Sequence, residues 1–266
     1  MIMRFFTFTL LVFFPIFLTP VSAGEVRVAV AANFKSTLKE MATHFEQATG
    51  HTTLISSGSS GKFYAQIKHG APFDVFFSAD VTRPQLLEKE GFVVPGSRFT
   101  YAIGRLTLWS PDPSLLKDDG ATVLSNGRFD HLAMANPKTA PYGTAAQQTL
   151  VALGLWNQVK DQIVQGENIG QTFHFVFSKN AQVGFVARSQ VLDSKINGAG
   201  SRWDVPENLY EPLRQQAVLL TNGQYNEAAK AFLNYVKGPE ARNIIEQFGY
   251  GLEKYRAETL CPAESE

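Results

Sequence analysis

VRVAVAANFKSTLKEMATHF, residues 26–45, joins a buried strand directly to an amphipathic helix. Residues 26–30 are apolar and rich in β-branched side chains apart from Arg27, which predicts a strand buried on both faces. Apolar residues then recur at the spacing of one helix face, at Phe34, Leu38, Met41, Phe45 and Ala48. A strand that runs straight into a helix is the first half of a βαβ unit.

Asn33 lies at the junction of this strand and helix, where an N-cap residue is expected. The free N–H groups of a first helical turn point into such a junction, and the helix dipole favours negative charge there. The segment therefore forms an anion site that needs no cationic side chain. Taken alone, such a segment is more often an ordinary turn in which Asn33 only caps the helix.

The N-terminal 23 residues have the pattern of a secretory signal peptide. Arg4 precedes an apolar run over residues 5–18, and Val21-Ser22-Ala23 supplies the small residues of a cleavage site. A membrane anchor is less favoured, because the run is short, contains Pro15 and lacks a stop-transfer sequence. We expect cleavage after Ala23, export to the periplasm and no insertion of the mature protein into the membrane.

Charge and cysteine content narrow the function classes. The chain has 24 Lys and Arg against 24 Asp and Glu, so it lacks the basic surface of a nucleic-acid-binding protein. Its single cysteine, Cys261, lies in a polar C-terminal segment, which excludes an internal disulfide. This thiol is either incidental or able to cross-link two chains.

Strand and helix patterns alternate along the chain, which predicts an α/β fold with mainly parallel, mixed sheets flanked by helices. We expect strands at 52–56, 75–78, 106–109, 132–135, 183–187 and 217–220. We expect helices at 61–69, 83–90, 144–153, 171–177, 226–236 and 239–248. Residues 136–143 are expected to form a loop, residues 193–216 to be irregular, and Asp80 to cap the helix that follows it.

The C-terminal helices need a sheet to pack on, which suggests two lobes. In the simplest arrangement the chain leaves a first lobe near Gly104 and returns to it near Pro206. The lobes would then comprise residues 24–104 with 207–252, and residues 105–206, followed by a loose tail at 253–266. Two crossing segments would form a hinge over a cleft.

Four loops rich in small or hydroxyl residues each precede a predicted helix, at 31–33, 56–61, 141–144 and 166–170. In a doubly wound sheet such loops gather at the carboxyl ends of the strands, where ligands bind. SSGSSG at 56–61 is the strongest signal, although a flexible surface loop has the same composition. A fully deprotonated tetrahedral oxyanion needs hydrogen-bond donors only, and these loops supply N–H, hydroxyl and amide groups.

The chain resembles the periplasmic molybdate-binding proteins of ABC transporters from about residue 25 to residue 252. The resemblance rests on VAVAANF (28–34), SSGSSGKFYAQIKHGAPFDVFFSAD (56–80), ANPKTAPYGTAA (135–146), ENIGQTF (167–173) and YVKGPEARNIIEQFGY (235–250). It implies a two-lobed periplasmic-binding-protein fold and a monomer that passes molybdate, and tungstate with it, to a membrane permease driven by a cytoplasmic ATPase. It implies no cofactor and no catalysis.

The resemblance also implies the residues that hold the oxyanion. They are Asn33 with the backbone of Ala32 or of Asn33 itself, Ser60 with Ser59 beside it, Tyr142, and the backbone N–H of Ile169. One position departs from the pattern, because Ala187 stands where some members carry a tyrosine. The hydroxyl of Tyr142 could replace this missing donor.

Other functions remain open on the residues alone. A receptor for sulfate, phosphate or an organic anion would use the same donors, and a structural or adhesive protein would not need the four loops to converge. A hydrolase using Ser59 or Ser60 would need a nearby base, and none can be assigned. The five histidines lack the spacing of a zinc site, and the chain has no Gly-x-Ser-x-Gly motif.

Overall fold

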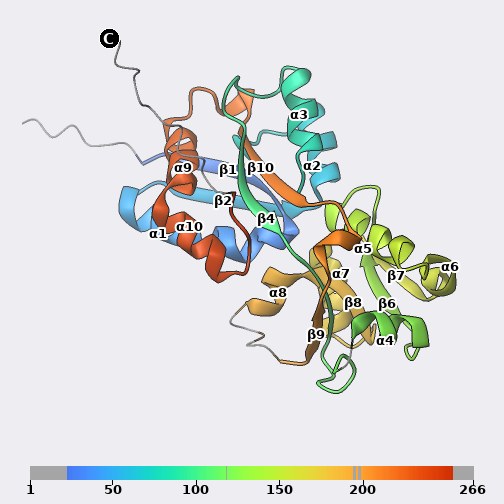
Figure 1. The fold of residues 1–266 in the computed structure, drawn as a ribbon. Coiled ribbons are helices and arrows are strands. Elements are labelled where there is room, and N and C mark those ends of the chain that lie inside the picture. Colours follow the sequence, from blue (N-terminus) through green and yellow to red (C-terminus); the bar gives the residue numbers. More distant parts are fainter. Residues whose placement is uncertain (1–22, 118, 194–195, 197–198, 254–266) are drawn as a thin grey trace, which may run out of the picture.

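The structure, a computed structural model, describes residues 23–253 apart from 118, 194–195 and 197–198. The predicted signal peptide up to residue 22 and Cys261 therefore lie outside the described residues. Among the residues described, no helix combines the length and apolar character needed to cross a membrane. The chain forms two lobes, each built on a five-stranded mixed sheet (Figure 1).

The first lobe holds the sheet of order β2-β1-β3-β10-β4. Its strands are β1 (Glu25–Ala31), β2 (Thr52–Gly58), β3 (Val75–Ser78), β4 (Phe99–Gly104) and β10 (Leu213–Leu219). Its helices are η1 (Ala32–Phe34), α1 (Lys35–Thr49), α2 (Ser60–Lys68), α3 (Thr82–Lys89), η4 (Thr221–Gly223), α9 (Glu227–Lys237) and α10 (Pro239–Gln247). β1 pairs in parallel with β2 and β3, whereas β10 is antiparallel to β3 and β4.

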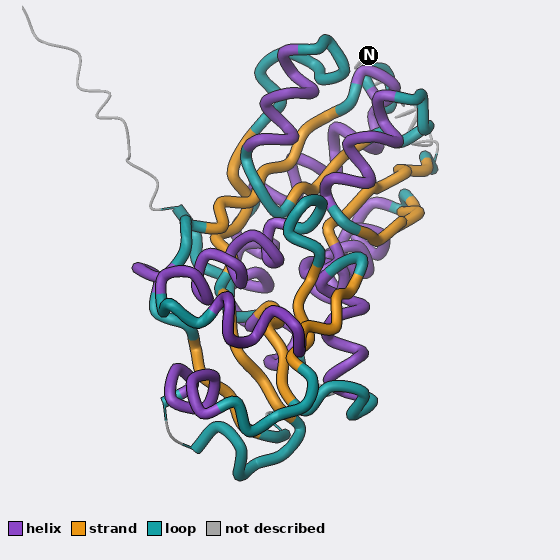
Figure 2. Tube along the Cα trace, turned by 90° about the vertical axis from the view of Figure 1, so that its right-hand side faces the viewer, coloured by secondary structure: helices purple, strands orange, loops and turns teal. Residues whose placement is uncertain are grey.

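The second lobe holds the sheet of order β7-β6-β8-β5-β9. Its strands are β5 (Leu106–Ser110), β6 (Leu132–Ala135), β7 (Ile163–Gly166), β8 (Val183–Ala187) and β9 (Ser201–Asp204). Its helices are α4 (Gly120–Asn126), α5 (Pro141–Ala152), α6 (Trp156–Val159), η2 (Lys160–Gln162), α7 (Ile169–Phe177) and α8 (Arg188–Leu192), and η3 (Glu207–Leu209) lies in the segment that leads back to the first lobe. Figure 2 shows the same two-lobe division from the side, with helices around the strands of each lobe.

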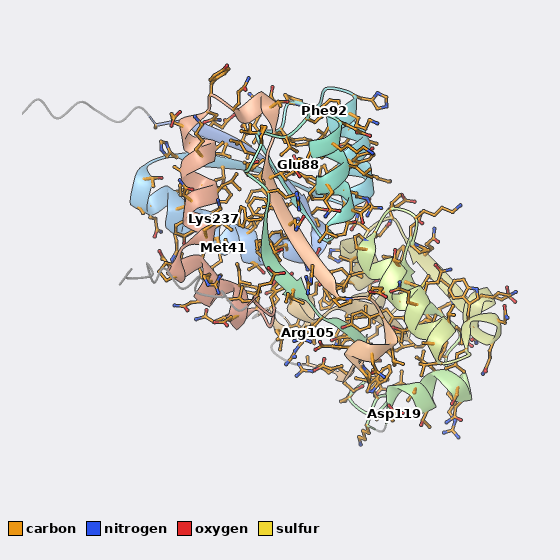
Figure 3. The ribbon with its side chains drawn as sticks, turned by 45° about the horizontal axis from the view of Figure 1, so that its top comes forward. Met41, Glu88, Phe92, Arg105, Asp119 and Lys237 are labelled. Carbon is orange, nitrogen blue, oxygen red and sulfur yellow. The ribbon has the colours of Figure 1, made fainter. Side chains whose placement is uncertain are left out.

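Two segments connect the lobes. The chain passes from β4 to β5 at Arg105, which Figure 3 labels at the junction of the two lobes. It returns through residues 205–212, between β9 and β10. The predicted pair of crossing segments is therefore present.

The alternation of side chains along β1 explains why helices cover both faces of the first sheet. Val28 and Val30 pack in a core with α1, α9 and α10, whereas Ala29 packs with α2 and α3 on the other face. All three residues are fully buried. A strand covered on both faces has to be apolar almost throughout, as the sequence of β1 is.

The two lobes repeat one topology although the sequence shows no internal repeat. One edge of the first sheet has the parallel strands β2-β1-β3, and one edge of the second has the parallel strands β7-β6-β8. In both sets the strand that comes first in the chain lies in the middle, and a helix follows each of the first two strands. Helices α1 and α2 in the first lobe therefore correspond to α5 and α7 in the second. In sheets wound this way ligands bind where the first strand ends, because the chain turns to opposite sides there.

Most predicted strands and helices are confirmed within a few residues, but two loop predictions are wrong. Residues 193–216 contain β9 and the start of β10, both of which obtain their partners from distant parts of the chain. Residues 136–143 contain the first turn of α5, which begins at Pro141 because proline suits the first helical position. The edge strands β4, β7 and β9 and the short helix α4 were not expected from the sequence.

Candidate functional site

A small cavity lies between the lobes, and the centre of a water-sized sphere can occupy about 10 Å³ of it. It is lined by Ala31, Ala32, Asn33, Gly58, Ser59, Ser60, Ala79, Ala140, Pro141, Tyr142, Asn168 and Ile169. Helices η1–α1 and α2 reach it from the first lobe, and α5 and α7 reach it from the second. The structure thus brings all six predicted site residues, and all four predicted loops, to one place.

The turn after β1 differs from its prediction in one respect. Asn33 is not a helix cap, because it lies inside the 3-10 turn η1, and the cap positions of η1 and α1 are Ala31 and Phe34. Its side chain is instead buried, with Nδ2 2.8 Å from Gln215 Oε1 and 3.1 Å from Tyr250 Oη. The Asn33 amide is therefore held by tertiary contacts rather than by its own helix.

Ser60 is the first residue of α2 and is fully buried. Its Oγ accepts a hydrogen bond from the N–H of Ala79 at 2.9 Å, so the hydroxyl proton of Ser60 is available for a ligand. The Oγ of Ser59 is also buried and has no partner among the described residues. Two hydroxyl groups therefore line the first-lobe wall of the cavity.

Helix α5 approaches the cavity with Pro141 and Tyr142 as its first two residues. The backbone N–H of Tyr142 belongs to the first turn, which has no acceptor within the helix. The hydroxyl of Tyr142 accepts from Gln215 Nε2 at 3.2 Å, and the side chain is 1% exposed. Tyr142 thus lines the cavity while its hydroxyl contacts the hinge strand β10.

The side chain of Asn168 caps helix α7 but does not bond the N–H of Ile169. Asn168 Oδ1 accepts from the N–H groups of Gly170 and Gln171, at 2.9 and 3.0 Å. The N–H of Ile169 precedes these two in the first turn and has no acceptor within the helix. Ile169 lines the cavity, so this N–H is a donor that α7 can offer there.

The lining is neutral and rich in donors. None of the twelve described residues around the cavity is charged. Four helix N-termini meet there, and each contributes partial positive charge to a small volume. Burial raises the pKa of Tyr101 and of Tyr142 well above the ordinary value, so these phenols remain protonated and neutral. Burial likewise raises the pKa of the neighbouring Tyr250.

The lobes contact each other around the cavity, as expected of a closed form. Gly61 N–H donates to the Thr139 carbonyl at 2.9 Å, and Arg83 Nη2 donates to the Lys138 carbonyl at 3.2 Å. Lys62 and Glu167 also form an ion pair between the two lobes. These contacts join α2 and α3 of the first lobe to the loops that precede α5 and α7.

A second set of contacts closes the opposite side. Ser189 of α8 donates from Oγ to the Asn33 carbonyl at 3.1 Å, and its Oγ lies 2.8 Å from Tyr250 Oη. Tyr250 Oη in turn donates to the same carbonyl at 2.7 Å. Ser189, Gln215 and Tyr250 were not among the predicted site residues, since no local pattern in the sequence links them to Asn33.

Two further predictions concern residues beside the cavity. Ala187 ends β8 fully buried, its N–H donates to Gln190 Oε1 at 2.9 Å, and it is not part of the cavity lining. Asp80 accepts from the N–H of Arg83 at 3.0 Å, so it does cap the first turn of α3, although Val81 occupies the formal cap position. The cavity gives no support to the hydrolase alternative, because none of its described lining residues could act as a base for Ser59 or Ser60.

A wider groove lies beside the cavity, between α2 and α3 on one side and α5 on the other. It shares Ala79 and Pro141 with the cavity and carries both signs of charge, on Asp80, Arg83, Lys138, Glu211 and Arg214. Its size and mixed charge do not suit a small anion.

The sequence is similar to those of known solute-binding proteins. The family model described as "Bacterial extracellular solute-binding protein" matches residues 26–251. The chain is 54% identical to the molybdate-binding protein ModA of Azotobacter vinelandii over 232 residues, which cover 87% of this chain and 91% of that protein. It is 48% identical to ModA of Rhodobacter capsulatus, over 88% of this chain and 91% of the relative.

Comparison of structures gives the same grouping. The periplasmic molybdate-binding protein of Azotobacter vinelandii superimposes with a TM-score of 0.83 at 44% identity, covering 86% of this chain and all of that one. The sulfate-binding protein SubI of Mycobacterium tuberculosis superimposes with a TM-score of 0.73 at 12% identity, over 85% of this chain and 86% of that one. The second likeness concerns the fold alone.

Proposed function

The chain belongs to the bacterial extracellular solute-binding proteins, and we propose that it captures molybdate in the cavity between its lobes for import by an ABC transporter. The observation that carries this proposal is the convergence of four helix N-termini on one uncharged, buried cavity. Such a cavity offers donors and partial positive charge without a counter-ion, which suits a small, fully deprotonated oxyanion. The two ModA relatives support molybdate as that oxyanion.

We propose that the ligand contacts come equally from both lobes. Asn33 and Ser60, with Ala32 and Ser59 beside them, would bind from the first lobe, and Tyr142 and Ile169 from the second. Each charge-assisted hydrogen bond contributes about 1.5–3 kcal/mol, and several together offset the desolvation of a small dianion. Tungstate, which has the same shape and charge, would bind by the same contacts.

The size of the cavity argues against an organic anion. Sites for drug-sized ligands span about 300–1,000 Å³. The cavity here is far smaller, because the centre of a water-sized sphere can occupy only about 10 Å³ of it. Sulfate and phosphate are small tetrahedral anions like molybdate and are the alternatives that the experiment below has to exclude.

The two-lobe arrangement supplies the binding mechanism. We propose that the lobes are residues 24–104 with 207–252 and residues 105–206, and that they close about the two crossing segments. Contacts from both lobes to one ligand exist only in the closed form, so binding shifts the population towards closure. The closed monomer, exported after cleavage behind Ala23, would then dock on a permease served by a cytoplasmic ATPase. One structural relative is the substrate-binding domain of a putative molybdenum ABC transporter.

Thermal unfolding with a panel of oxyanions tests the proposal. At about one hundred times its Kd, molybdate should add about 2.7 kcal/mol to the free energy of unfolding. For a chain of this size that stabilisation raises Tm by roughly 5–10 °C. Sulfate and phosphate at equal concentration should shift Tm far less. An equal shift with sulfate would contradict the assignment to molybdate, and no shift with any oxyanion would contradict the anion site itself.

Replacing Ser60 by Ala should weaken molybdate binding. The variant loses the one hydroxyl proton that the Ala79 contact leaves for a ligand. We expect a loss of about 1–3 kcal/mol, the range for a charged partner that is left short of a hydrogen bond. Calorimetric titration measures it, with Ser57→Ala as the control because Ser57 lies in the same segment but is exposed. Equal affinities for the two variants would remove Ser60 from the site.

A further inference from the structure

Gln215 lies directly behind the cavity, on the strand that leads from the hinge into the first sheet. It belongs to β10, is fully buried, and stands at a register shift between Gln215 and Gln216 in the pairing of β10 with β4. It does not line the cavity itself. A buried amide without a ligand contact has to satisfy its hydrogen bonds within the protein.

The Gln215 amide contacts the predicted ligand residues of both lobes. Its Oε1 lies 2.8 Å from Asn33 Nδ2 in the first lobe, and its Nε2 lies 3.2 Å from Tyr142 Oη in the second. The same Oε1 lies 2.9 Å from Tyr101 Oη. Gln215 therefore links Asn33 to Tyr142 from behind the cavity wall.

A count of protons shows that this network is not fully satisfied. Tyr101 Oη has a single proton, but two acceptors are in reach, Gln215 Oε1 at 2.9 Å and the Ser78 carbonyl at 3.1 Å. Asn33 Oδ1 is buried without a partner among the described residues. Asn33 also holds its side-chain donor, Nδ2, towards Gln215 and Tyr250, so an anion would meet no donor from the Asn33 side chain.

Rotation of the Gln215 and Asn33 side-chain amides by 180° would give Asn33 Oδ1 a donor and leave Tyr101 with a single acceptor. Gln215 Nε2 would then donate one proton to Asn33 Oδ1 and the other to Tyr101 Oη, which frees the Tyr101 proton for Ser78. Gln215 Oε1 would accept the proton of Tyr142. Asn33 Nδ2 would take the present place of the orphan Oδ1 and keep a proton without an acceptor in the protein, in a residue that lines the cavity.

One contact opposes the rotation. Tyr250 Oη lies 3.1 Å from the Asn33 amide and 2.7 Å from the Asn33 carbonyl, and its single proton cannot serve both oxygen atoms once the amide is turned. The two arrangements are therefore close in hydrogen-bond count. A ligand that accepts a hydrogen bond from Asn33 selects the rotated one.

We propose that Gln215 is a positioning residue of the anion site, whose amide turns together with that of Asn33 and so presents Asn33 Nδ2 to a fully deprotonated oxyanion. This inference rests on the proposed function. In the unrotated arrangement the free atom of the Asn33 side chain is Oδ1, an acceptor, and an oxyanion without protons gains no bond from it. Gln215 thus acts on the ligand through Asn33 and without touching it.

A double-mutant cycle tests whether Gln215 acts through Asn33. The variants are Gln215→Met, Asn33→Ala and the double variant, with Gln216→Met as the matched control because Gln216 bonds Arg98 and Thr100 outside the network. Calorimetry should show about a tenfold or larger rise in the molybdate Kd for each single variant, as expected for one charge-assisted bond. The double variant should bind no more weakly than Asn33→Ala alone.

The outcomes that overturn the inference are distinct. If the two losses multiply in the double variant, or if Gln215→Met binds like the Gln216→Met control, Gln215 does not position Asn33. If the wild-type protein fails to bind molybdate, the proposed function fails and the inference with it.

A second measurement uses the wild-type protein alone, so it does not depend on whether a variant folds. In ¹⁵N-labelled wild-type protein, molybdate should shift the side-chain amide signals of both Asn33 and Gln215, although Gln215 does not reach the ligand. Unchanged Gln215 signals at saturation would contradict the coupled rotation.

Discussion

Replacing Asn33 by Asp is expected to abolish molybdate binding. The substitution keeps the shape of the side chain but turns a donor into a carboxylate, in a cavity whose described lining carries no compensating charge. Two like unit charges about 4 Å apart repel by about 4 kcal/mol at the effective dielectric constant of such sites. With a doubly charged ligand, the Kd measured by calorimetry should rise by about a thousandfold or more.

Asn33→Ala is the control for this prediction, because it removes the same donor without adding a charge. It should bind molybdate more weakly than the wild type but far more tightly than the Asp variant. The melting temperature of each variant without ligand shows whether the fold survives. An Asp variant that binds within tenfold of the Ala variant would place Asn33 away from the anion.

Replacing Gly61 by Val is expected to prevent closure of the lobes. A Cβ at this position would lie 3.0 Å from both Cα and the carbonyl oxygen of Thr139 in the other lobe, and valine adds two methyl groups beyond it. Overpacking of this kind costs about 1–3 kcal/mol, and here the cost falls on the closed form alone. The molybdate Kd should therefore rise by roughly 5- to 150-fold.

Gln66→Val is the matched control, since it introduces the same valine side chain at an exposed position of the same helix. Small-angle scattering separates closure from local damage. At a molybdate concentration that saturates the wild type but lies below the raised Kd of Gly61→Val, the wild type and the control should become more compact, whereas Gly61→Val should not. A Gly61→Val variant that compacts and binds normally would show that the Gly61–Thr139 contact does not form part of closure.

The sequence predicts those parts of the fold that depend on local pattern. β1 and α1 follow from the apolar runs after Glu25, and Gly238-Pro239 marks the boundary of α9 and α10 as expected. Strands β4 and β9 could not be predicted from local pattern, because each is defined by pairing with a strand distant in the sequence. β4 pairs with β10, and β9 pairs with β5. Three of the four loops at the candidate site follow strands that have a local sequence pattern, whereas the loop at 166–170 follows the unexpected strand β7 and was predicted from its own composition.

The chemistry within the site is less predictable than its place. Asn33 was found at the right junction, but as a helix cap, because the sequence does not reveal that a 3-10 turn would take its side chain to Gln215 and Tyr250. Gln215 had no signal of its own and fell in a segment expected to be irregular. Ser189 likewise reaches Asn33 only through the docking of the second lobe. Contacts between lobes depend on the whole topology rather than on any window of sequence.

The most direct test of the account is diffraction at the molybdenum absorption edge from crystals grown with molybdate. The account predicts one anomalous peak in the cavity between the lobes, with ligand oxygens bonded to Ser60 Oγ, the Ile169 N–H and Asn33 Nδ2. A peak at any other place, or a cavity that stays empty at saturating molybdate, would contradict it.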